Sequence, residues 1–212
     1  MDDPRRAEVL RLLDRYLVEI VEANDFCPWA KAARRNGEIG RAVLFGEPTI
    51  EAWTTAASAL LADPEVRVAM VVAPEFPGSL ADLRDVRSIL AAKLTNAGIA
   101  EFHPDADLDL GSPGRLVRFV RRSPDPMIQL VPIAILDSVR TGDRRVIDRH
   151  ELAAVLSGAP LAVEVDIGET IAAANFATVG RDPGAVTATL DAIAADRRAA
   201  YARVGIDIST SR

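Results

Sequence analysis

The sequence of 212 residues has one cysteine and two histidines, and each scarcity excludes a class of protein. One cysteine cannot form an internal disulfide, and so few Cys and His residues exclude a cysteine-rich zinc site. No uncharged apolar run approaches the ~20 residues of a membrane span, and the charged start, Met1 to Arg6, lacks a signal peptide's apolar stretch. We therefore expect a soluble, cytoplasmic protein that contacts no membrane and carries no cofactor.

Lysine is almost absent: 2 residues against 23 arginines. Base composition in a GC-rich genome accounts for such a ratio, so arginine enrichment alone implies no phosphate site. The net charge of −6 disfavours a general nucleic-acid binder, because it repels phosphates. Apolar residues at 49% and charged residues at 26% are typical of a folded globular chain.

Hydrophobic periodicity predicts strands alternating with helices. Runs rich in β-branched residues predict strands near 41–45, 66–72, 99–103 and 127–131. Apolar stripes at helical spacing predict helices over 5–22, 50–61 and 80–94, with a short helix from Pro28 to Asn36. The alternation predicts one α/β domain over residues 1–212, with a small mixed or parallel sheet of about four strands and helices packed on it.

The two remaining stretches are less regular. Residues 104–126 contain several prolines and aspartates and predict a long ordered loop. Beyond the motif-bearing part, about 8–140, the extension 141–212 looks divergent. Short helices are expected over 133–139 and 150–156, a strand over 161–165, a helix over 171–179 and a final helix from Asp182-Pro183.

Three segments place reactive or hydrogen-bonding side chains between prolines, which stiffen the backbone. They are Asp25-Phe-Cys-Pro-Trp-Ala30, Phe102-His-Pro-Asp105 and Arg121-Arg-Ser-Pro-Asp-Pro126. Stiff loops are suited to holding a constellation of side chains in place.

In this order and spacing, the three segments resemble the motifs of DUF1415, an uncharacterised family of bacterial and plant proteins. Its motifs are Asn-Leu-Cys-Pro-Phe-Ala, Phe-His-Pro and Asn-Arg-Ser-Pro-Tyr-Pro, and the resemblance covers roughly residues 8–140. This chain differs at Asp25, Arg121 and Asp125, which stand where the family has Asn, Asn and an aromatic residue. Residues 128–132 also lack the His and Arg of the family's next strand, so an activity that needs them is not expected. The family implies no established reaction.

Cys27 precedes a predicted helix, whose unpaired N–H groups and dipole lower the pKa of a thiol and favour the reactive thiolate. The alternatives are a buried small hydrophobe or a metal or haem ligand. Trp29, in the same segment, is a candidate for contacting a substrate.

His103 ends a predicted strand, and ligands of open α/β sheets bind beyond the carboxyl ends of strands. It is a candidate acid/base, or alternatively a histidine hydrogen-bonded to the loop. Arg121, Arg122 and Ser123 are candidates for binding a carboxylate or phosphate, with Asp105 beside them. Ser123 is alternatively a turn residue, and one arginine alternatively pairs with an aspartate.

These residues support three hypotheses. The first is an enzyme of acyl or group transfer or hydrolysis, with Cys27 as nucleophile, His103 as acid/base and Arg122 as the anchor of an anionic substrate. The second is a binding module for an anionic metabolite or haem, and the third is a protein-interaction domain whose motifs are structural. The first predicts that the three side chains line one cleft, each within roughly 10 Å of the next, because unliganded sites are looser than a hydrogen bond.

Overall fold

The computed structural model describes residues 3–27, 29–136 and 167–208. The motif-bearing part alternates helices and strands, and two long helices follow it. In chain order the elements are α1 (Pro4–Tyr16), the π-helix η1 (Leu17–Glu22), α2 (Ala30–Arg35), β1 (Ile39–Val43), α3 (Ile50–Leu61), β2 (Val68–Val72), α4 (Leu80–Lys93), β3 (Ala97–Phe102), α5 (Pro113–Val120), β4 (Met127–Pro132), α8 (Ile167–Arg181) and α9 (Pro183–Val204).

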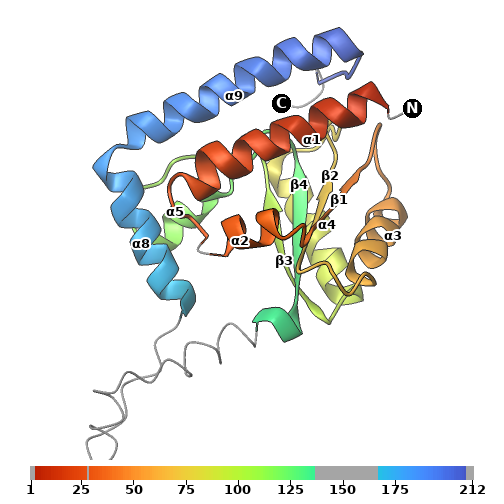
Figure 1. Cartoon of the computed structure of the whole chain (residues 1–212), viewed down its shortest axis with the longest axis horizontal. Coiled ribbons are helices and arrows are strands. Elements are labelled where there is room, and N and C mark those ends of the chain that lie inside the picture. Colours follow the sequence, from red (N-terminus) through yellow and green to blue (C-terminus); the bar gives the residue numbers. More distant parts are fainter. Residues whose placement is uncertain (1–2, 28, 137–166, 209–212) are drawn as a thin grey trace, which may run out of the picture.

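The four strands form one mixed sheet in the order β1-β2-β4-β3. β1 and β2 are parallel, whereas β4 runs antiparallel to both of its neighbours. The predicted α/β class and small sheet of about four strands are therefore confirmed, and the strands predicted near 41–45, 66–72, 99–103 and 127–131 each overlap an observed one. Figure 1 shows the sheet with helices on both sides.

Successive residues of each central strand point to opposite faces of the sheet, and the two faces have separate cores. Ala69 and Val71 of β2 face α3 and α4, where the fully buried Trp53 and Leu83 pack against them. Met70 and Val72 face a core to which α1, η1, α5 and α9 contribute. We call this second core the main core, and the last helix, α9, belongs to it.

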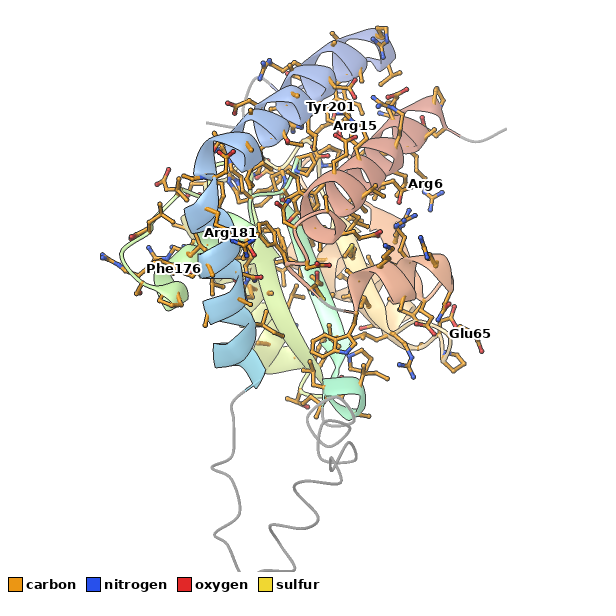
Figure 2. All side chains as sticks on the ribbon, turned by 60° about the vertical axis from the view of Figure 1, so that its left-hand side comes forward. Arg6, Arg15, Glu65, Phe176, Arg181 and Tyr201 are labelled. Carbon is orange, nitrogen blue, oxygen red and sulfur yellow. The ribbon has the colours of Figure 1, made fainter. Side chains whose placement is uncertain are left out.

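Ion pairs join α1 to α9, which lie side by side in Figures 1 and 2. Arg11 and Arg15 of α1 both donate to the carboxylate of Asp196 on α9, Arg11 through Nη1 at 2.8 Å and Arg15 through Nη1 at 2.6 Å. The two guanidiniums lower the pKa of Asp196 to about 2. Figure 2 shows Arg15 and Tyr201 where the two helices face each other.

The predicted loop over 104–126 is wrong in part, because it contains α5. Ser112 caps this helix by accepting from the N–H of Arg115, and Pro113 occupies its first turn, where a missing N–H costs no hydrogen bond. Leu116 and Phe119 bury its apolar side in the main core. Proline content indicated a loop, whereas Pro113 marks a helix start.

The other helical predictions agree with the described residues, with one refinement. The helix expected over 5–22 ends in the π-helix η1. The predictions for 150–156 and 161–165 lie outside the described residues, as does the end of the helix expected over 133–139. Among the described helices, none combines the length and apolarity that crossing a membrane requires.

Candidate functional site

Three connections meet at one end of the sheet. Phe102, the last residue of β3, pairs with Met127, the first residue of β4, so the segments before and after this pair are neighbours. The backbone N–H of His103 donates to the carbonyl of Arg121 at 3.1 Å. The connection after β2 joins them, because Ala73 donates to the carbonyl of Pro126. The antiparallel pairing of β3 and β4 thus brings the second and third motif segments together.

A cleft of about 320 Å³ opens where this end of the sheet meets α9, and we call it the α9 cleft. Its polar lining comes from both motif segments and from α9, and its apolar lining comes mainly from α9. The lining residues are His103, Pro104, Asp105, Arg122, Ser123, Pro124, Leu190, Ile193, Ala194, Arg197, Arg198 and Ile208.

Both ring nitrogens of His103 are held by backbone groups. Nδ1 accepts from the N–H of Asp105 at 3.1 Å, and Nε2 lies 3.3 Å from the carbonyl of Gly78. These partners fit a neutral ring with its proton on Nε2, because Nδ1 must accept and Gly78 can only accept. The side chain is 1% exposed, and its burial lowers the pKa of His103. The ring is thus fixed at the cleft wall as a neutral donor.

Arg122 and Ser123 line the cleft with different freedom to bind a ligand. Arg122 donates through Nε to the carbonyl of Pro104 at 2.9 Å, and its two Nη groups make no hydrogen bond to a described residue. Ser123 is buried and donates its hydroxyl to the carbonyl of Asp125 at 2.6 Å. Arg122 therefore retains donors for an anion, whereas the proton of Ser123 is used to hold the loop.

A buried ion pair fixes this loop to α9. Arg197 donates through Nε to Oδ1 of Asp125 at 2.7 Å and through Nη2 to the carbonyl of Pro74 at 3.2 Å. Tyr201 donates its hydroxyl to the other carboxylate oxygen of Asp125, and desolvation with the nearby carboxylate raises the pKa of Tyr201. The sequence reasoning missed Arg197 and Tyr201 as site residues. Arg197 does carry a signal, because it lies four residues from both Ile193 and Tyr201 on the apolar stripe of α9.

Arg121 does not line the α9 cleft, whereas Asp105 lines it together with Arg122. Arg121 lines a second, smaller hollow with Glu101, and its guanidinium lies 3.8 Å from that carboxylate. Asp105 is exposed, and its carboxylate lies 3.7 Å from Nδ1 of His103. His103 borders both cavities, so it lies between the surroundings of Arg121 and those of Arg122.

Cys27 packs as a half-buried side chain against the main core. The predicted effect of the helix start is present, because backbone hydrogen bonds from Trp29 and Ala30 favour the thiolate, but burial outweighs them and raises the pKa of Cys27. Asp25 turns the chain before it at φ 51°, a left-handed conformation that Asp tolerates. Asn175 of α8 holds the turn by donating to the carbonyl of Phe26 at 3.2 Å.

The predicted common cleft thus contains His103 and Arg122, while Cys27 lines neither cavity described here. Of the other predicted site residues, Asp105 and Ser123 line the α9 cleft, and Arg121 borders the smaller hollow. Trp29 is 43% exposed and borders neither. Within the described residues, no group of three or more His, Cys, Asp or Glu side chains is placed to hold a metal ion.

No family model, curated protein or solved structure matches this chain. The resemblance to DUF1415 therefore stays a prediction. Functional inference rests on the geometry of the cleft.

Proposed function

We propose that this protein binds a small organic monoanion in the α9 cleft, with the anionic group held by Arg122 and Arg198. The observation that carries the proposal is a ligand-sized cleft with two guanidiniums that make no ion pair with a described residue. Its volume, about 320 Å³, is at the lower end of the range for small-molecule sites.

The charges of the cleft favour one negative group on the ligand. Arg197 is neutralised by Asp125, so it adds little to the net charge. Arg122 and Arg198 remain, with Asp105 as the carboxylate in the same lining. A guanidinium presents a planar fork that matches a carboxylate, which makes a carboxylic acid the simplest fit.

The apolar lining favours an uncharged ligand body. Leu190, Ile193 and Ile208 line the cleft. An aliphatic or aromatic body removes this surface from water, whereas a small inorganic anion leaves it hydrated. The proposed ligand class is therefore a monocarboxylate with an apolar body.

The enzyme hypothesis receives less support from this geometry. The candidate nucleophile Cys27 lies outside the cleft and its pKa is raised, so the thiolate is scarce near neutral pH. Both nitrogens of His103 are occupied by backbone partners. Haem ligation by both Cys27 and His103 is disfavoured for the same reason, because Cys27 does not line a cavity that His103 borders.

The proposal is tested by calorimetric titration with butyrate, octanoate and 3-phenylpropionate, each paired with its neutral amide. We expect at least one carboxylate to bind and its amide to bind far more weakly. Arg122→Gln and Arg198→Gln should each weaken binding about tenfold or more, because a hydrogen bond to a charged group contributes about 1.5–3 kcal/mol.

Arg203→Gln is the matched control, because Arg203 is an exposed arginine of α9 that does not line the cleft. Failure of every carboxylate to bind at millimolar concentration contradicts the proposal. Equal weakening by Arg203→Gln, or equal binding of acid and amide, does so as well.

A further inference from the structure

Three arginines converge on one carboxylate at the β3 edge of the sheet, and a fourth lies beside them. Glu101 of β3 is reached by Arg84 and Arg87 of α4, at 3.4 and 3.2 Å, and by Arg121 after α5, at 3.8 Å. Arg118 of α5 borders the same hollow as Arg84, Glu101 and Arg121. We call these five residues the Glu101 arginine cluster.

The cluster has a local excess of three positive charges, because Glu101 is the one carboxylate of the set. This excess is opposite in sign to the chain's net charge of −6. Arg118 makes no ion pair with a described residue, so its charge is not offset by a neighbour. Like charges held this close repel one another, and binding of an anion relieves the repulsion.

Two guanidiniums that border the hollow, those of Arg118 and Arg121, also have unused hydrogen-bonding capacity. The side chain of Arg118 makes no hydrogen bond to a described residue, whereas the buried Nε of Arg87 faces Glu101 at 3.2 Å and Arg87 does not line the hollow. The Arg121 side chain makes no hydrogen bond to a described residue, and burial lowers the pKa of Arg121. An oxyanion supplies acceptors for these donors.

The space between these side chains suits one oxygen of a ligand. The hollow has a volume of about 20 Å³ and is open to solvent at the surface. This is room for about one water-sized group. A tetrahedral oxyanion can place one oxygen in the hollow and present the others to the guanidiniums at its rim.

We propose that the Glu101 arginine cluster binds a phosphoryl dianion, either as inorganic phosphate or as the phosphate group of a small monoester. Arg84, Arg118 and Arg121 hold its oxygens, and Glu101 keeps the guanidiniums gathered. A dianion fits the excess of three charges better than a carboxylate does. This site is distinct from the α9 cleft, and His103 lies between the two.

The test is calorimetric titration of the full chain with inorganic phosphate and, separately, with phenyl phosphate. We expect one site, with Arg118→Gln and Arg121→Gln each weakening phosphate binding at least tenfold. Tighter binding of phenyl phosphate indicates a monoester as the natural ligand, whereas tighter binding of phosphate indicates the free ion. Arg115→Gln is the matched control, because Arg115 is an exposed arginine of α5 that pairs with Asp109 outside the cluster.

Phosphate binding by Glu101→Gln distinguishes a cluster that binds an anion from one that only stabilises the fold. Removing the carboxylate raises the positive excess, so phosphate should bind severalfold more tightly provided that circular dichroism shows a folded chain. The proposal is overturned if neither phosphate ligand binds at millimolar concentration, or if Arg115→Gln weakens binding as much as Arg118→Gln. It is also overturned if Arg122→Gln alone removes binding, since the phosphate then occupies the α9 cleft.

Discussion

The three proline-stiffened segments, which look alike in sequence, occupy two different environments in the fold. The segment around Cys27 packs its cysteine against the main core, where burial raises the thiol pKa. The segments around His103 and Arg122 line the α9 cleft. The difference follows from what adjoins each segment: a helix leads to Cys27, whereas β3 ends immediately before His103 and β4 begins immediately after the segment of Arg122. Strand ends gather at one edge of a sheet, and a helix end is under no such constraint.

Both regions nevertheless depend on the C-terminal helices. Asn175 of α8 binds the carbonyl of Phe26 beside Cys27. Arg197 of α9 binds Asp125 beside the cleft. The anchor differs in kind, a neutral amide in one region and a buried ion pair in the other. The cleft region should therefore be the more sensitive of the two to loss of its anchor.

The largest expected effect is that of Arg197→Leu, which leaves the carboxylate of Asp125 buried without its cation. Breaking a buried ion pair in this way costs about 3–5 kcal/mol in the free energy of unfolding. Urea unfolding followed by circular dichroism measures it. The double variant Arg197→Leu with Asp125→Leu should recover part of the loss. A loss below about 1 kcal/mol, the range of exposed ion pairs, contradicts the burial of this pair.

A smaller effect on stability is expected at Cys27, in the region that does not line the α9 cleft. Cys27→Ala removes a half-buried sulfur from the core and should lower the free energy of unfolding by about 1 kcal/mol. Carboxylate binding in the α9 cleft should not change. Alkylation of Cys27 by iodoacetamide should have its pH midpoint above that of the urea-unfolded chain, because burial raises the pKa of the folded thiol. Rapid alkylation near neutral pH, or loss of binding in Cys27→Ala, points back to a reactive cysteine.

Much of the fold is encoded in local patterns that can be read from the sequence. The run 66–72 predicted β2, and the apolar stripe over 80–94 predicted α4, which Ser79 begins through a capping box with Asp82. Strand direction was not predicted, because a buried apolar run is compatible with either orientation. α5 was missed because the prolines around it outweighed its short apolar stripe.

The site was predictable only where topology could be inferred. His103 and Arg122 follow and precede adjacent strands, so their proximity was expected and is found in the α9 cleft. Arg197 was not predicted, because an arginine in a charged stretch of helix usually faces solvent. Its position on the apolar stripe was the available signal, and its partner Asp125 is 72 residues away in sequence.

The smallest expected effect is a dependence of stability on pH that comes from His103. Burial lowers the pKa of the folded histidine below its ordinary value of 6.5, with Asp105 opposing and Arg197 reinforcing this shift. Between the pKa of His103 in the folded chain and its pKa in the unfolded chain, the unfolded chain binds more protons than the folded one. The free energy of unfolding therefore falls as the pH falls. The contribution of His103 is complete above about pH 6.5 and is lost progressively as the pH decreases towards the folded pKa.

His103→Gln isolates this effect, because glutamine offers a donor for Gly78 and an acceptor for Asp105 but does not titrate. Urea unfolding of both proteins at several values between about pH 5 and 8, a range that spans the ordinary histidine pKa, gives the difference in stability at each pH. His150, the other histidine of the sequence, is the same in both proteins, so the difference removes its contribution. The wild type should lose stability relative to His103→Gln as the solution is acidified. A constant difference, or a relative gain by the wild type in acid, means that His103 is not held neutral in the fold, and the ring is then free to take a proton at the wall of the cleft.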